Sequence, residues 1–361
     1  MRRLAMLLIG ACTTTTEPAL DQPLSEGDRQ AAVQFGTTLT QPSPPAIVCS
    51  THQGWLTHLA ATTDDPATAA AALTGLAECS TTWHEPDVRR ALARWWSQPT
   101  PVLAKGLIAV ADPLVATSEP DDPVVRGMVR LASLHPELAV KLAALESLDR
   151  RAWGREPEVA SAFIDAMLAV RQPVLTATVL HWLRFEASEV HFQVQPRLRA
   201  AATLALRDID PGVRGRAALA LARLAGDDPQ ILALVRERLA DPHPFTRAAA
   251  AKALADLAQE TLVHDLVPLL DDHAATTWRS RPFARLDGTT DRIRFVASPH
   301  ERVDEAVLIG LQRLTADLAR PYVIRSIDPT YAELDLLSAT RDAKAWYQAA
   351  YGEESPPEEG G

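Results

Sequence analysis

One short motif constrains the fold of this chain more than any other feature. It consists of an acidic residue, a proline, any residue, a valine and an arginine, and a segment rich in alanine and leucine follows it. Complete copies begin at Glu85, Asp122 and Asp210, and weaker copies begin at Glu156 and Pro244. A motif that returns along a chain in this way is typical of stacked helical repeats, in which one structural unit packs on the next.

The motif has a direct physical interpretation as the start of a helix. The acidic residue caps the helix, the proline occupies the first turn, where no N–H partner is needed, and the valine begins the buried stripe. In the copy at Asp210 the apolar positions Val213, Ala217, Ala220, Leu221 and Leu224 fall at helical spacing. Helices so rich in alanine carry too little bulk for an independent core, so each pair must stack on its neighbours.

The spacing of the copies predicts where helices are added. The motif prolines recur at intervals of roughly 35 residues, except between Pro157 and Pro211. That longer interval must hold an extra helix, which residues 173–186 or 197–207 supply. Hydrophobic residues make up 47% of the chain and aromatic residues only 5%, which favours helices over a strand-rich fold. We therefore predict an all-α solenoid over residues 46–351.

These motifs resemble HEAT repeats, in particular the short form found in phycobilin lyases and their bacterial relatives. The resemblance spans residues 84–272 and extends to 50–320 with degenerate ends. It implies a right-handed superhelix that scaffolds contacts between proteins. It also implies that the motif's aspartate and arginine, such as Asp122 with Arg126 and Asp210 with Arg214, form a structural ladder between adjacent repeats.

The N-terminus has the pattern of an export signal. Two arginines precede an apolar stretch of about eight residues, far short of the roughly 20 needed to cross a bilayer. Residues 9–12, Ile-Gly-Ala-Cys, resemble the lipobox of bacterial lipoproteins. The resemblance implies that the signal peptide 1–11 is removed and that Cys12 carries the lipid anchor. A misassigned start codon or an ordinary buried helix is the alternative.

The residues after Cys12 fit a tether. Segment 12–45 contains a run of threonines and many prolines, serines and glutamines, and it has too little apolar surface to fold. Thr13 rather than an aspartate follows the cysteine, so by resemblance to enteric lipoproteins nothing retains the protein at the inner membrane. We expect it at the outer membrane, on the periplasmic side or at the surface.

The remaining cysteines, Cys49 and Cys79, form an even pair. Residues 50–61 and 66–79 are predicted to be two helices that break at Asp64, Asp65 and Pro66. Cys49 then begins the first helix and Cys79 ends the second, and these ends are neighbours in an antiparallel pair. In an oxidising compartment this placement predicts a disulfide. Two buried free thiols or a metal pair are the alternatives, although no CxxC spacing supports a metal.

Residues 278–297 interrupt the alanine and leucine rhythm. An Asp-Gly turn at 287–288 lies between segments in which apolar and charged residues alternate, which predicts an inserted β-hairpin. This segment gathers arginines beside three aromatic residues in an otherwise acidic chain, and we take it as a candidate contact site. The alternative is a solvated hairpin that caps a hydrophobic end. The arginines concerned are Arg279, Arg281, Arg285, Arg292 and Arg294.

Signatures of catalysis are missing. The motifs GxSxG, GxxxxGK[ST] and GxGxxG do not occur. Two His-Glu pairs, at 84–85 and 300–301, are reminiscent of deoxyhypusine hydroxylase, a HEAT-repeat enzyme with a di-iron site, but the family's other pairs are absent. A bilin lyase is the other enzymatic alternative. His181 and His191 lie beside aromatic residues and are expected to pack. We predict no catalytic residue, no cofactor and no metal.

Charge limits the partners. The formal net charge is -10 and the pI is about 5.5, which is poorly suited to a phosphate backbone, so no nucleic acid is expected and a DNA-glycosylase-like helical repeat is disfavoured. The sequence predicts a non-catalytic protein-binding or scaffolding lipoprotein at the bacterial cell envelope, with a protein or peptide partner. It leaves open whether a concave groove or the hairpin binds.

A final helix at 342–351 and a disordered acidic tail at 352–361 complete the chain.

Overall fold

A computed structural model describes ten segments of the chain: residues 46–78, 85–97, 99–119, 121–149, 156–186, 194–225, 228–257, 259–295, 302–315 and 329–352. Within these segments there are fifteen α-helices and four short strands. The chain divides into two compact units, residues 1–153 with 284–289, and residues 154–283 with 290–361. The predicted all-α solenoid with one inserted hairpin is confirmed.

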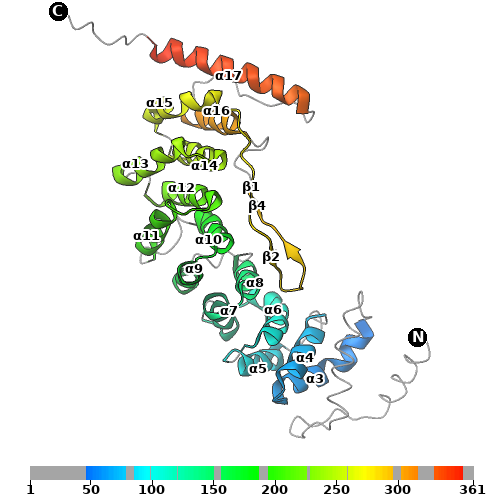
Figure 1. The fold of residues 1–361 in the computed structure, drawn as a ribbon. Helices are drawn as coiled ribbons and strands as arrows, with labels where there is room; N and C mark the ends of the chain where they lie inside the picture. The colour runs from blue at the N-terminus through cyan, green and yellow to red at the C-terminus, as the bar shows by residue number, and fades with distance from the viewer. Residues whose placement is uncertain are drawn as a thin grey trace, which may run out of the picture. The chain divides into compact units, whose positions relative to one another are not determined.

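The first unit is built from helix pairs (Figure 1). Helices α4, α6 and α8 pack in one row, and α3, α5 and α7 pack in a second row. Each helix therefore contacts its counterpart in the next pair, as a helical repeat requires. The helices are α3 (Ala46–Thr62), α4 (Pro66–Glu78), α5 (Glu85–Trp95), α6 (Pro101–Val115), α7 (Pro123–Leu134) and α8 (Leu138–Asp149).

The second unit continues the same plan and adds the insertion. Helices α10, α12, α14 and α16 pack in sequence and form what we call the α10–α16 row. The long interval in the motif, from Pro157 to Pro211, holds the three helices α9, α10 and α11, one more than the intervals on either side, as predicted. The helices are α9 (Pro157–Val170), α10 (Pro173–Glu186), α11 (Gln195–Ala205), α12 (Pro211–Ala225), α13 (Pro229–Glu237), α14 (Pro244–Ala255), α15 (Val263–Leu266), α16 (Val303–Leu314) and α17 (Pro329–Tyr351), with 3₁₀ turns η3 (Arg238–Ala240), η4 (Glu260–Leu262) and η5 (Val267–Asp271).

The motif starts helices largely as the sequence predicts. The Asp122 carboxylate accepts a hydrogen bond from the Val124 N–H (2.8 Å), and the Asp210 carboxylate accepts one from the Gly212 N–H (2.8 Å). Glu156 is a correction, because its longer side chain makes no capping hydrogen bond to α9. At α14 the cap is His243, whose Nδ1 accepts from the Phe245 N–H (3.2 Å).

Small residues make the core of the second unit. In α12, Val213, Ala217, Ala220 and Leu221 are fully buried, whereas Leu224 at the end of the predicted stripe is half-buried. Helix α14 is buried along most of its length, because its alanines face helices on more than one side. Close packing of slender helices thus replaces bulky side chains in this core.

The insertion is an antiparallel hairpin between η5 and α16. Strand β1 (Trp278–Arg279) pairs with β4 (Arg294–Phe295), and β2 (Phe283–Ala284) pairs with β3 (Thr290–Asp291). Gly288 adopts a φ of 85°, which favours glycine, and its N–H donates to the Arg285 carbonyl (3.0 Å). The predicted Asp-Gly turn is therefore present.

The two ends of the insertion lie together. Ala275 pairs with Arg302 in an isolated antiparallel bridge. The Val303 N–H donates to the Ala274 carbonyl (3.1 Å), and the Asp304 N–H donates to the Asp272 carbonyl (3.0 Å). The chain thus leaves the helical stack and returns to it at adjacent points.

Several predictions fall on residues outside the described segments. These include the signal peptide, Cys12, the tether up to residue 45, Cys79 and most of the acidic tail. Helix α3 begins at Ala46, so Cys49 lies inside its first turn and not before it, and the disulfide with Cys79 stays a prediction. The final helix, predicted over 342–351, lies within the longer α17. None of the described helices has both the length and the apolar character needed to span a membrane.

Candidate functional site

The hairpin has two chemically different faces at its base. Trp278 and Phe295 are directly opposite across β1 and β4, and so are Arg279 and Arg294. The two rings are 5% and 7% exposed and stack at 5.3 Å with an interplanar angle of 11°. Both arginines are exposed. Because successive side chains of a strand alternate between faces, the aromatic face and the arginine face are fixed relative to each other.

The aromatic face rests on the α10–α16 row, beside which Figure 1 shows the hairpin base. The Trp278 ring lies directly over Gly212 of α12, where an added Cβ would come within 2.3 Å of the indole. Phe245 of α14 lies beside it, with ring centroids 6.4 Å apart. The absence of a side chain at Gly212 therefore makes the seat for the tryptophan.

The Phe295 ring packs against two polar side chains. The guanidinium carbon of Arg216, in α12, lies 3.9 Å from the Phe295 ring centroid and 5.9 Å from that of Phe245. Nη1 of Arg216 is 2.9 Å from Nδ1 of His181 in α10, and the His181 ring packs on Phe295 at 5.6 Å. Arg216 is only 5% exposed. A cation between aromatic faces is held by their quadrupoles, so the hairpin is fixed to three helices.

One backbone hydrogen bond and one hydrogen bond to a side chain extend the pairing of β1 and β4 by one residue. The Ser280 N–H donates to the Ile293 carbonyl (2.8 Å), and the Ile293 N–H donates to the Ser280 hydroxyl (2.9 Å). Ser280 is 4% exposed and Ile293 is half-buried. Alternation then places Arg281 and Arg292, both exposed, beyond Arg279 and Arg294 on the arginine face.

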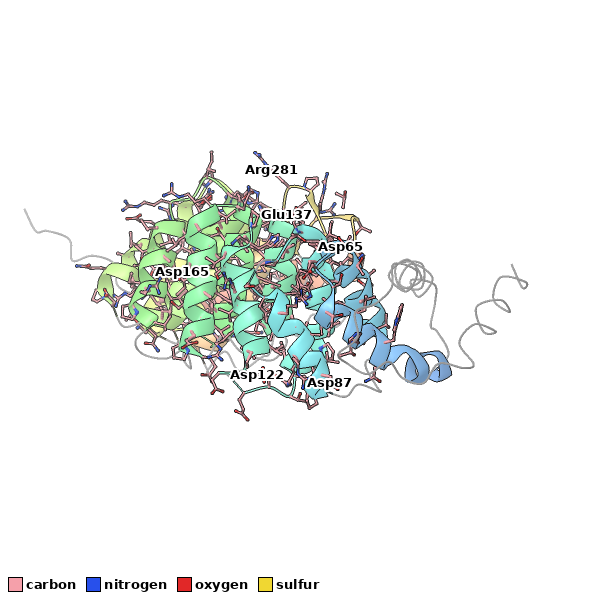
Figure 2. The ribbon with its side chains drawn as sticks, turned by 90° about the horizontal axis from the view of Figure 1, so that it is seen from below. Asp65, Asp87, Asp122, Glu137, Asp165 and Arg281 are labelled. Atoms are coloured by element: carbon pink, nitrogen blue, oxygen red, sulfur yellow. The ribbon has the colours of Figure 1, made fainter. Side chains whose placement is uncertain are left out.

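All five predicted arginines are exposed. Alternation from the paired residues of β1 and β4 places Arg279, Arg281, Arg292 and Arg294 on one face of the hairpin. Arg281 projects away from the ribbon in Figure 2, and Arg285 lies next to the turn. The segment 278–295 also contains Asp287 and Asp291, so its net charge is +3 in a chain of net charge -10. The Thr289 hydroxyl and amide donate to Asp287 and hold the pKa of its carboxyl below the ordinary value.

Other acidic and basic residues of the motif are structural. Arg214 makes two hydrogen bonds of 2.7 Å to Asp241, and Arg247 bonds Asp272 at 2.6 Å, each joining one repeat of the second unit to the next. In the first unit Arg89 pairs with Asp122. Burial alone would raise the pKa of Asp241, but the hydrogen bond from Arg214 holds it below the ordinary value.

The predicted ladder is therefore present, with two corrections to its members. Asp122 and Arg214 belong to it, and each pairs with a residue of a neighbouring repeat, as the resemblance implies. Arg126 is exposed, and no carboxylate in the described segments pairs with it. Asp210 caps α12 and pairs with no cation in the described segments, because the ladder arginine of its own repeat reaches forward to Asp241.

Sequence reasoning found the hairpin arginines but missed the residues that seat them. Gly212 stands at the variable position of its motif, and Arg216 was placed only among residues outside the apolar stripe. His181 was expected to pack on aromatic residues, but the ring that it contacts comes from the hairpin. One signal was available, since a glycine beside the proline of a helix start indicates a close approach.

The described segments contain no group of three or more histidine, cysteine, aspartate or glutamate side chains arranged to hold a metal ion. Residues 79, 84, 191, 300 and 301 lie outside those segments, and the side chain of Glu85, the first residue of α5, lies outside the described part of the structure.

Comparisons with known proteins agree with this architecture. A family model of HEAT repeats matches residues 196–281, which run from α11 to just beyond β1. The solved structure of Kap121p bound to Pho4p has a TM-score of 0.51 with 13% sequence identity, and the match covers 92% of this chain and 40% of that chain. Structures of Kap121p alone and of a Kap121p mutant each give a TM-score of 0.42 at 12% identity, covering 92% and 96% of this chain and 40% and 42% of theirs.

These likenesses define the class of protein by fold: a helical solenoid of the HEAT type. The chain spans about 40% of the length of the Kap121p structures that it matches. No curated protein sequence matches it.

Proposed function

We propose that this protein is a non-catalytic HEAT-repeat scaffold that binds a protein or peptide partner through the arginine face of its hairpin. The observation that carries the proposal is the seating of Trp278 and Phe295 on α12 and α14. That seating turns the opposite face, with Arg279 and Arg294, outward. Solenoid insertions often carry the binding site, and guanidinium groups recognise carboxylates in bidentate geometry.

The same seating favours the hairpin over the helices beneath it. Side chains of the hairpin itself cover part of the α10–α16 row, so that part of the row is not available to a partner. The covering residues are well buried, and the exposed arginines lie on the opposite face of the hairpin. The structure of Kap121p bound to Pho4p supports the proposal that such a solenoid binds a protein, although the likeness lies in the fold alone.

We also propose that the protein is exported and held by a lipid on Cys12 at the bacterial cell envelope, at the outer membrane. The support is the run Ile-Gly-Ala-Cys at 9–12 after two arginines and an apolar stretch. Replacing Cys12 with serine should release the protein into the soluble periplasmic fraction or leave it as an unprocessed precursor. A variant that fractionates and migrates like the wild type would contradict the anchor.

Partner capture tests the hairpin. The full chain, in mild detergent, is used to capture envelope proteins, and the experiment is repeated with Arg279, Arg281, Arg292 and Arg294 changed together to glutamine. We expect the variant to lose partners that the wild type retains at low salt and releases at high salt.

A matched control removes the same charge elsewhere. Arg126, Arg130 and Arg223 are exposed on helices, Arg207 is exposed in the turn after α11, and changing all four to glutamine should leave capture unchanged. Equal capture by the wild type and the hairpin variant would exclude the hairpin as the binding site. A stoichiometric transition metal on the purified wild-type protein would instead favour an enzyme of the deoxyhypusine-hydroxylase type.

A further inference from the structure

We propose that the arginine face binds an extended acidic peptide whose carboxylates stand on every second residue. This inference rests on the proposed function and specifies its partner. It follows from the register of the hairpin, from the seating of its other face and from the distribution of charge along the chain.

The register sets the spacing of the arginines. Arg279 and Arg294 are directly opposite, and the ladder through Ser280 and Ile293 places Arg281 and Arg292 one alternation further along. Positions i and i+2 of a strand lie about 6.6 Å apart on one face. We call two arginines that lie opposite each other on the two strands a rung. An extended peptide has the same repeat, so its alternate side chains match successive rungs of the hairpin.

Each rung suits one carboxylate. Opposite residues of an antiparallel pair have Cβ atoms about 5 Å apart, and like charges in such a pair are destabilising. A carboxylate has two oxygens that accept hydrogen bonds, so one carboxylate can bridge two guanidinium groups. Arg279 and Arg294 form the first such rung, and Arg281 and Arg292 form the second.

The aromatic face makes this arrangement rigid. Trp278 lies against Gly212, and Phe295 lies over Arg216, so the hairpin base cannot rotate about its long axis without unstacking both rings. A partner therefore does not bear the cost of ordering the ribbon, which otherwise reduces affinity.

Charge favours a narrow partner over a broad anionic surface. Five arginines and two aspartates give residues 278–295 a net charge of +3, so the rest of the chain carries -13. A membrane surface or a nucleic acid would meet that negative charge as well as the hairpin, and the repulsion extends over about 8 Å at physiological ionic strength. A single extended peptide can lie along the arginine face alone, because the two strands that carry the arginines are only about 5 Å apart.

The decisive comparison uses two labelled peptides of one composition. In the first, three glutamates alternate with threonines; in the second, the three glutamates are adjacent. Binding to the full chain, in mild detergent, is measured by fluorescence anisotropy at low salt. We expect the alternating peptide to bind about fivefold tighter, the ratio that roughly 1 kcal/mol gives.

Two pairs of substitutions separate charge from geometry. Changing Arg279 and Arg294 together to lysine retains salt-sensitive binding but removes the preference, because an ammonium group is a point charge without the guanidinium fork. Changing both to glutamine weakens both peptides. The Arg126→Gln, Arg223→Gln pair is the control and should retain the fivefold ratio. An unchanged melting temperature and tryptophan emission show that the hairpin is still seated.

Equal binding of the two peptides by the wild type would overturn the inference, and so would a preference that survives both substitutions at the first rung. Binding to vesicles that contain phosphatidylglycerol is measured in addition. Arginine-dependent binding to vesicles with no binding of either peptide would overturn the inference in favour of a lipid surface. None of these outcomes depends on the capture experiment, so the proposed function and its partner class can fail separately.

Discussion

Gly212 of α12 and Trp278 of the hairpin are in contact with no room for a single further carbon, since a Cβ on Gly212 would lie 2.3 Å from the indole. Gly212→Ala should therefore displace the tryptophan. Overpacking costs roughly 1–3 kcal/mol, and the gain in helix propensity offsets up to about 1 kcal/mol of it. We expect a lower midpoint of urea unfolding and weaker partner capture.

A double-mutant cycle isolates the contact between these two residues. With Trp278 replaced by leucine, the added methyl group meets a smaller side chain, and Gly212→Ala should become neutral or stabilising. The same loss of stability in both backgrounds would show that the glycine acts through the helix alone.

Arg216 should hold the hairpin through the ring of Phe295. Arg216→Met retains an unbranched side chain but removes the cation, and a desolvated cation–π contact contributes roughly 2 kcal/mol. Phe295→Leu should remove part of the same energy, so the two losses, measured by urea unfolding, should add to more than the loss in the double variant. Strict additivity would mean that the two residues do not stabilise each other.

The stability of the second unit should fall in mildly acidic solution because of His243. Burial, followed by the charge of Arg214, holds the pKa of His243 below its ordinary value of 6.5. The unfolded chain then takes up a proton at a pH at which the folded chain does not. The contribution is fully present above pH 6.5 and is lost as the pH falls towards the pKa of the folded state.

Aspartate at this position provides the test. His243→Asp can still accept the hydrogen bond from the Phe245 N–H, but it does not titrate between pH 5.5 and 7.5 when its pKa is ordinary. The variant should lose less of its melting temperature over that range than the wild type. His135, which is also buried with a lowered pKa, and Asp149, whose pKa is raised to about 6, continue to titrate and contribute to the remaining slope. An equal slope in both proteins would contradict the assignment.

Asp149 at the end of α8 should have the opposite effect on the first unit. Burial, and then the charge of Glu146, raise its pKa to about 6 from an ordinary 3.8. The folded chain holds a proton that the unfolded chain has released, so stability falls as the pH rises from about 4 to about 6. Asp149→Asn should raise the melting temperature at pH 7.5, and the gain should shrink at pH 4.5. A gain of the same size at both pH values would contradict the raised pKa.

The predicted disulfide between Cys49 and Cys79 can be tested by mass spectrometry. The bond would close a loop of about 30 residues and stabilise the fold by roughly 3–4 kcal/mol on the chain-entropy model. Non-reduced protein from an oxidising compartment should contain no thiol that can be alkylated at either position. Two alkylated cysteines in the folded protein would exclude the bond.

Features that depend on neighbouring residues could be predicted from the sequence. Asp122 and Asp210 cap their helices because each cap needs only an acid and the N–H groups two or three residues later. The hairpin turn followed from Asp287 and Gly288 for the same reason. Glu156 shows where this reasoning fails, because an acid in the motif does not ensure that its longer side chain bends back to the backbone.

Features that depend on stacking could not be predicted in this way. Arg214 pairs with Asp241, 27 residues further along the chain, and not with the aspartate of its own motif. The seat of the hairpin joins Gly212 and Arg216 to Trp278 and Phe295, which lie in a different part of the sequence. Only the three-dimensional packing of the repeats brings these pairs together, so the spacing of the motif alone does not specify them.

The bridge between Ala275 and Arg302 holds the two ends of the hairpin insertion together at the helical stack. Because the chain departs and returns at one place, residues between these two positions can be lengthened, shortened or recharged while η5 and α16 retain their contacts. The recognition surface and the framework can therefore change independently during evolution, and an engineer could exchange the ribbon as a cassette. The aromatic pair is the one part of that cassette which must be retained, since it fits the seat that the framework provides.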